Sequence, residues 1–205
     1  MIDAQFIDDL ASAAPTPGGG GASACCGALA AALASMVGNL TVGKARYADV
    51  EGEVRASLER LDALRAQLTA LVDKDARAFE PLAAAYRMPR TTPEEVDAKD
   101  AALQAALVSA CEVPLSIMRA CAEVVRECDF MARNGSRMAV SDAGAGAALA
   151  KAALQAASLN VYINVGSMAD AAQAEAYRAQ ADELMRTACA QADDVLSYVM
   201  GEIGA

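Results

Sequence analysis

The residues able to do acid–base chemistry in this chain are few, because the 205-residue sequence contains no His. His is the commonest general base and zinc ligand, and it is part of every Ser-His or Cys-His catalytic pair. Proton transfer must therefore come from Asp, Glu, Lys, Tyr or Cys. The six Cys show no CxxC spacing, so we expect small reduced thiols in a cytoplasmic protein and no metal site.

Asp75 interrupts an apolar stripe on a helix predicted over residues 50–86. The other members are spaced by threes and fours: Val54, Leu58, Leu61, Leu64, Leu68, Leu71, Phe79, Leu82 and Tyr86. An unpaired carboxylate facing inward among them costs several kcal/mol or shifts its pKa upward. Two interpretations stay open: a catalytic carboxyl, or a structural ion pair with Lys74, Arg77 or another helix. Asp73 lies about 200° around the helix from Asp75 and is the weaker candidate.

A second inward-looking helix is predicted over residues 143–165, with Lys151 as its one charged side chain. Lys151 either extends to the surface or directs a cation at an anionic or carbonyl-bearing ligand. Asp142 is predicted to cap this helix. Asn160 and Asn164 follow on the same face as Asp142, and each needs a hydrogen-bond partner from a neighbouring helix or from a ligand.

A loop of Pro15, Thr16, Pro17 and four glycines, Gly18 to Gly21, precedes a helix predicted over residues 22–42. Free N–H groups at a helix start suit an anion or a carboxylate. Residues 38–45 nearly match the phosphate-binding pattern GxxxxGK[ST] and include Lys44. Because Ala45 replaces the hydroxyl that holds magnesium, and no strand precedes the segment, we do not expect a nucleotide site.

The elements that must position these residues are predicted to be helices. Ala accounts for 52 of the 205 residues and aromatic residues for 4%, a composition typical of an all-α protein. Further helices are predicted over residues 2–13, 92–126 and 169–200. We expect one domain over residues 1–205, a bundle of five or six long antiparallel helices.

The charge balance limits the classes of binding partner that the protein is expected to have. The net charge is −10, so nucleic acid and anionic membranes are poor candidates. Residues 10–43 carry no charge, but Pro, Gly, Ala and Ser dominate them, so we interpret this segment as a buried helix and not a membrane span.

Five segments, taken together and in order, resemble the cyclodeaminase/cyclohydrolase family. This family comprises the C-terminal domain of formiminotransferase-cyclodeaminase and free-standing methenyltetrahydrofolate cyclohydrolases. The segments are Pro15–Gly20, Asn39–Lys44, Val72–Asp75 with Phe79, Ala85–Pro89, and Ser141–Gly144 continuing to Lys151. One departure is Gly21, which stands where the glycine loop often continues with Ser.

The resemblance implies an all-helical homodimer that acts on one-carbon adducts of tetrahydrofolate without a metal or redox cofactor. No formiminotransferase domain is attached, which favours hydrolysis of 5,10-methenyltetrahydrofolate to 10-formyltetrahydrofolate. The alternatives are a cyclodeaminase that releases ammonia from formiminotetrahydrofolate, and a non-catalytic folate-binding helical protein.

On this resemblance Asp75 is the group that takes and returns a proton. Lys44 or Lys151 is expected to tune it from a facing helix, and Asp142 is the second choice. Lys and Arg at the rim are expected to meet the glutamate tail. Contacts to the pterin or its carboxylates are predicted for Thr16, Pro17, Gly18, Gly19, Gly20, Asn39, Asp73, Asn160 and Asn164.

Overall fold

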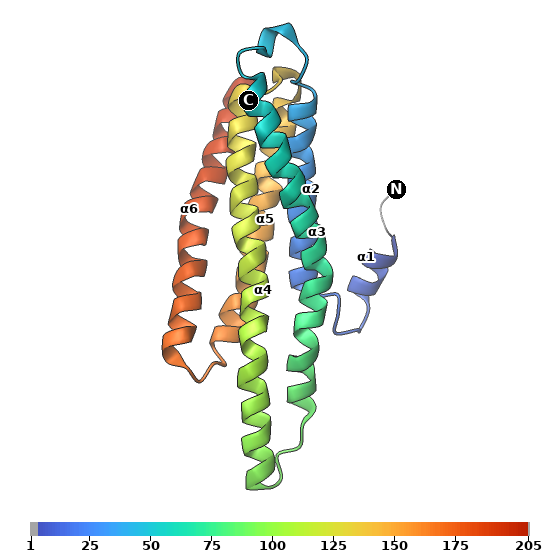
Figure 1. The fold of residues 1–205 in the computed structure, drawn as a ribbon, viewed down its shortest axis with the longest axis vertical. Coiled ribbons are helices and arrows are strands. Elements are labelled where there is room, and N and C mark those ends of the chain that lie inside the picture. The colour runs from blue at the N-terminus through green and yellow to red at the C-terminus, as the bar shows by residue number, and fades with distance from the viewer. Residues whose placement is uncertain (1–3, 205) are drawn as a thin grey trace.

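The computed structural model describes residues 4–204, and this part of the chain is all-helical, with no strand. The helices are α1 (Ala4–Ala11), α2 (Gly19–Asn39), α3 (Glu51–Arg87), α4 (Pro93–Asn134), α5 (Val140–Val165) and α6 (Ala171–Ile203), with short 3₁₀ turns η1 (Ala45–Tyr47) and η2 (Arg137–Ala139). The helices α2 to α6 run alternately up and down in one bundle, and α1 lies apart from them (Figure 1). The all-α prediction is confirmed.

Helix boundaries follow local signals where these are strong. The side-chain oxygen of Thr92 accepts a hydrogen bond from the backbone N–H of Glu95, and the Glu95 carboxylate accepts one from the backbone N–H of Thr92. With Pro93 at the first helical position, this capping box starts α4 where the sequence predicts it. The predicted end near residue 126 is wrong, because α4 continues to Asn134.

Two other helix starts differ from the prediction. Helix α2 begins at Gly19, so three glycines form its first turn instead of a loop before it. Helix α5 begins at Val140 with Ala139 as its N-cap, so Asp142 lies in the first turn and is not the cap. In both cases packing against neighbouring helices extends the helix beyond what local propensity indicates.

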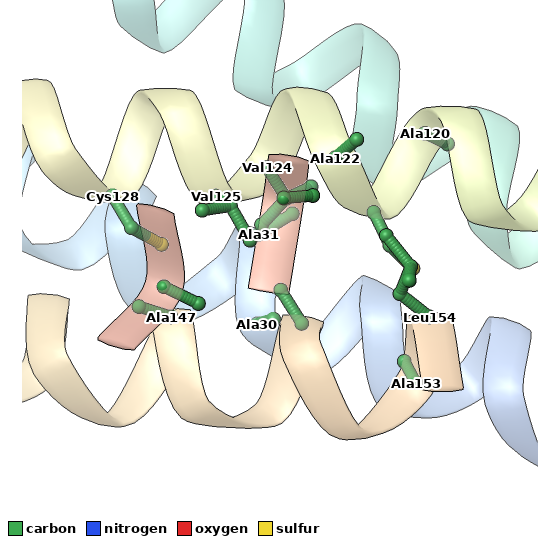
Figure 2. Close-up of a cluster of buried hydrophobic side chains, with 14 of the residues drawn as sticks. Ala30, Ala31, Ala120, Ala122, Val124, Val125, Cys128, Ala147, Ala153 and Leu154 are labelled. Carbon is green, nitrogen blue, oxygen red and sulfur yellow. The ribbon is translucent and has the colours of Figure 1, made fainter. Parts of the chain in front are cut away.

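Small side chains let α2, α4 and α5 approach closely at the centre of the bundle (Figure 2). A methyl group at Gly27 would lie 2.8 Å from the Cys121 sulfur, and one at Gly146 would lie 3.1 Å from the Ala30 carbonyl oxygen. The surrounding Ala30, Ala31, Ala147 and Ala153 are fully or almost fully buried. The abundance of Ala therefore reflects short distances between helices.

By length and composition alone, α2 and α4 could each cross a membrane. About half of each apolar window is buried inside the bundle, 56% in α2 and 50% in α4. Core helices of soluble proteins have the same properties, so the sequence-based expectation of no membrane span stays a prediction.

Candidate active site

A cavity of about 340 Å³ lies where the start of α2 meets the later turns of α3 and the end of α5, with α4 behind it. This volume is within the range of about 300–1,000 Å³ that is usual for small-molecule sites. The cavity is lined by Pro15, Thr16, Gly18, Gly19, Gly20, Asp75, Ala78, Phe79, Leu82, Tyr86, Ala110, Val113, Asn160, Ile163 and Asn164. The glycine segment, the predicted acid and both predicted Asn therefore come together.

Asp75 is the one charged residue among those lining the cavity within residues 4–204. Burial raises the pKa of its carboxyl above the ordinary value of 3.8, and a hydrogen bond from the backbone N–H of Gly21 opposes this rise. Desolvation is the larger effect. The carboxyl is thus able to hold a proton at a higher pH than an exposed Asp does.

The carboxyl also lies at the N-terminus of α2, where backbone N–H groups have no partner within the helix. Gly18, the N-cap, supplies no side-chain hydrogen bond. The Asp75 carboxyl of α3 therefore accepts a hydrogen bond from the first turn of α2, as an N-cap side chain would. The predicted ion pair with Lys74 or Arg77 does not form, since neither residue is in an ion pair with Asp75 in the described chain.

Gly20 leaves the space that the Asp75 carboxyl occupies. A methyl group at Gly20 would overlap all three carboxyl atoms of Asp75, the farthest of them at 2.5 Å. At Gly19, by contrast, the nearest atom to a methyl group would be the Asn160 amide nitrogen at 3.9 Å. Gly20 is therefore required, because the Asp75 carboxyl lies too close to it to leave room for a side chain.

The two Asn of α5 behave differently. The Asn164 side chain is buried, and its amide nitrogen donates to the backbone carbonyl of Ala110 in α4 at 2.7 Å. Asn160, one turn earlier, is half-buried beside Gly19. Asn164 therefore combines a structural bond with a place on the cavity wall, and Asn160 presents an amide to whatever the cavity holds.

These polar groups face an apolar wall. The sequence analysis did not assign this wall to the site. Phe79, Leu82 and Tyr86 follow Asp75 on the same side of α3, and Ile163 closes the wall from α5. The signal was present in the sequence, because positions 75, 79, 82 and 86 continue one helical stripe. Lys99 secures the end of this wall by donating to the backbone carbonyls of Tyr86 and Met88, at 2.8 and 2.9 Å.

Several predicted site residues lie elsewhere in the chain. Asp73 and Asn39 are exposed and do not line the cavity, and Pro17 lies beside Gly21 and does not line it either. Asp142 and Lys44 lie near the opposite end of the bundle, beside the starts of α5 and η1.

The expectation that Lys44 or Lys151 tunes Asp75 is wrong within a single chain. The Lys151 ammonium group contacts both carboxylate oxygens of Asp193 in α6, at 2.6 and 2.7 Å. The Lys44 ammonium group lies 3.4 Å from the Ser136 hydroxyl, past the far end of α2. The helix periodicity placed Lys151 on α5 but contained no information about which neighbour it would face. Lys44 lies in the loop between α2 and η1 and not on a facing helix.

The raised pKa of Asp75 predicts a specific dependence of stability on pH. The folded state holds this proton more tightly than the unfolded chain, so stability falls as pH rises from 3.8 through the raised pKa. Asp75→Asn removes this dependence. Above the raised pKa, the free energy of unfolding of Asp75→Asn is expected to exceed that of the wild type. Below pH 3.8 the two free energies should become similar. Urea unfolding of both proteins over a pH series measures the difference.

A variant that is less stable than the wild type at neutral pH would contradict this prediction. That result would mean that the carboxylate stabilises the start of α2 by more than its burial costs.

Comparison with known proteins gives consistent matches. Residues 3–183 match the family model described as formiminotransferase-cyclodeaminase. The chain is 41% identical over 198 residues to a methenyltetrahydrofolate cyclohydrolase of Methylorubrum extorquens, covering 97% of this chain and 95% of that protein. It is 35% identical over 191 residues to the rat formimidoyltransferase-cyclodeaminase, of which it spans only 35%.

A solved structure agrees with these matches. The crystal structure of formiminotetrahydrofolate cyclodeaminase from Thermotoga maritima superposes with a TM-score of 0.81 at 32% identity. The match covers 100% of this chain and 96% of that one.

Proposed function

Because the chain belongs to the formiminotransferase-cyclodeaminase family, we propose that it is a methenyltetrahydrofolate cyclohydrolase, which converts 5,10-methenyltetrahydrofolate into 10-formyltetrahydrofolate. The observation that carries the proposal is the half-buried Asp75 carboxyl, whose pKa is raised by desolvation, in a cavity of suitable size. The similarity to the Methylorubrum cyclohydrolase extends over almost the full length of both chains and supports the choice of reaction.

The cavity suits a flat, positively charged substrate. Phe79 and Tyr86 offer aromatic surface to the pterin ring, and the Asn160 amide offers both a donor and an acceptor to its polar edge. The Asp75 carboxylate stabilises the methenyl cation electrostatically, and a partly desolvated site strengthens this attraction.

The reaction then needs one group that takes a proton and gives one back. Water adds to the methenyl carbon, and the Asp75 carboxylate accepts one proton from that water. The carbon–N5 bond breaks while protonated Asp75 delivers this proton to N5. The remaining hydroxyl of the tetrahedral carbon becomes the formyl carbonyl and loses its proton to solvent. The sum is one water consumed and one proton released, and Asp75 returns to its starting state.

A second candidate is the cyclodeaminase reaction, in which N10 attacks a formimino carbon and ammonia leaves. The match to the Thermotoga cyclodeaminase over the full chain favours it. It proceeds through a similar tetrahedral carbon, so the same carboxyl serves both reactions.

Two assays on the purified protein separate the candidates. The first follows hydrolysis of 5,10-methenyltetrahydrofolate, and the second follows ammonia release from 5-formiminotetrahydrofolate. We expect acceleration of the first well above the uncatalysed rate. Ammonia release without hydrolysis would establish the cyclodeaminase instead, and tight folate binding without either reaction would indicate a non-catalytic folate-binding protein.

The proposed enzyme needs neither a metal nor an organic cofactor. Within residues 4–204, no group of three or more His, Cys, Asp or Glu side chains is arranged to hold a metal ion. We therefore expect the hydrolysis rate to be unchanged after dialysis against a chelator. A loss of rate that added Mg²⁺ or Zn²⁺ reverses would contradict this prediction.

We further propose that the protein works as a homodimer in the cytoplasm, with a folate as its small-molecule partner. The dimer is supported by an apolar face on α2 and α5 that the single chain leaves exposed. Cytoplasmic location is supported by six free thiols with no disulfide among them.

A further inference from the structure

Helix α4 has a buried proline, Pro114, in its interior. At this position an ordinary residue would donate its backbone N–H to the carbonyl oxygen of residue 110, but proline has no N–H to donate. The carbonyl of Ala110 therefore lacks its usual partner within the helix. Because Ala110 is itself buried, this oxygen needs a donor from outside α4.

The side chain of Asn164 on α5 supplies that donor. Its amide nitrogen, Nδ2, lies 2.7 Å from the Ala110 carbonyl oxygen. An Asn amide is a planar group with a donor nitrogen on one side and an acceptor oxygen on the other. Since a carbonyl oxygen can only accept, Nδ2 must face Ala110 and Oδ1 must point away from it. The proline of α4 thus decides which way the Asn164 amide is turned.

The Oδ1 atom of Asn164 is open to the cavity. Within residues 4–204 no group donates a hydrogen bond to it, and no fully buried side-chain oxygen lacks a partner. Oδ1 therefore keeps accessible surface, although Asn164 as a whole is only 8% exposed. Because Asn164 and Ala110 both line the cavity, its wall has a fixed acceptor that calls for a donor from the occupant.

This acceptor lies at the closed end of the cavity. Tyr86 and Ile163 mark the opening, with side chains 52% and 73% exposed, whereas Ala110 and Val113 beside Asn164 are buried. A flat ring that enters between Tyr86 and Ile163 therefore brings its leading edge to Oδ1, and any chain attached to the opposite end of the ring remains at the opening.

We infer that Oδ1 of Asn164 accepts a hydrogen bond from an N–H group of the substrate ring and so directs the donor-bearing edge of that ring to the closed end of the cavity. The inference rests on the proposed function for the identity of the ring, because a pterin carries an amino group and a ring N–H on one edge. A ring with only acceptors on this edge leaves Oδ1 unpaired. Asn164 is thus a specificity-determining residue as well as a link between α4 and α5.

The experiment must separate binding of the ring from support of the Ala110 carbonyl. Pro114→Ala makes this possible, because residue 114 then has a backbone N–H that can satisfy Ala110 without Asn164. In this background we compare Asn164 itself with Asn164→Asp and Asn164→Leu. Asp keeps an acceptor oxygen and loses the amide donor, and Leu has a similar size but loses both.

Binding of tetrahydrofolate, measured by anaerobic isothermal titration calorimetry, gives a readout without turnover. In the Pro114→Ala background, Asn164→Leu is expected to raise Kd about 10- to 100-fold, as for a buried donor of the ligand left unpaired. Asn164→Asp should stay close to the Pro114→Ala reference. Ser158→Ala is the matched control, because Ser158 is buried on α5 and bonds the Gln155 carbonyl but does not line the cavity.

Thermal unfolding follows the structural part of the role. With Pro114 present, Asn164→Leu should lower Tm by at least about 2 °C, because the Ala110 carbonyl loses its donor. In the Pro114→Ala background the same substitution should change Tm much less while the loss of affinity remains.

Three results would overturn the inference. If Pro114→Ala restored both Tm and affinity to Asn164→Leu, Asn164 would serve the Ala110 carbonyl alone. If Asn164→Asp bound as weakly as Asn164→Leu, the ligand would need the amide donor and not the acceptor. If Ser158→Ala weakened binding as much as Asn164→Leu, the effect would not be local to the cavity. The expected pattern of affinities with no turnover by the wild type would refute the proposed reaction and leave this inference intact.

Discussion

Asp75→Asn is expected to lower kcat for the folate reaction at least about 100-fold, the lower end of what a general acid–base group contributes. The amide keeps the size of the carboxyl but neither accepts the proton of water nor returns it to N5. KM should change less than kcat, because Phe79, Tyr86 and Asn160, which we propose as the ring-binding residues, are untouched. Steady-state kinetics at several substrate concentrations measure both constants.

The matched control is Asp73→Asn, two residues away. Asp73 is exposed and does not line the cavity, so its removal should leave kcat within about two-fold, as for surface substitutions away from a site. Equal losses in the two variants, or full activity of Asp75→Asn, would show that the proton is carried by another group.

The pH profile adds an independent check on the same residue. The carboxylate form starts the reaction, so kcat/KM should fall as pH decreases through a pKa above 3.8. In Asp75→Asn this limb should be absent. An unchanged acid limb in the variant would assign it to a different titrating group.

Gly20→Ala is the second substitution with a large expected effect. The added methyl group would overlap the Asp75 carboxyl, the farthest of its atoms at 2.5 Å. Either the acid or the start of α2 must move, and displacement of a catalytic group by about 1 Å can cost about 100-fold in rate. We expect a loss of this order in kcat, with the variant still folded because Ala favours a helix.

Gly201→Ala provides the control for helix propensity, since a methyl group there meets no atom within 4 Å. It should keep full activity and gain about 0.5–1 kcal/mol of stability. Circular dichroism and thermal unfolding of both variants separate the local effect from global damage. Normal kcat in Gly20→Ala would mean that the Asp75 carboxyl has room to move without consequence.

Much of the architecture was readable from the sequence. The dominance of Ala, the stripe from Val54 to Tyr86 and the Thr92-Pro93 start signal determine helices and their inward faces, because helix periodicity and capping are local properties. The same stripe identified Asp75 as a carboxyl at a position where an apolar residue is expected. The resemblance to the cyclodeaminase/cyclohydrolase family agrees with the family model and with the Methylorubrum cyclohydrolase.

The tertiary structure decided which residues meet. It placed Gly20 against Asp75, assigned Asn164 to the Ala110 carbonyl and paired Lys151 with Asp193. It also separated Lys44 and Asp142 from the cavity by almost the length of α2. Periodicity specifies the face of each helix, but contacts between residues tens to more than a hundred positions apart depend on how the helices pack. That packing follows from side-chain volumes across the whole core, which no single segment contains.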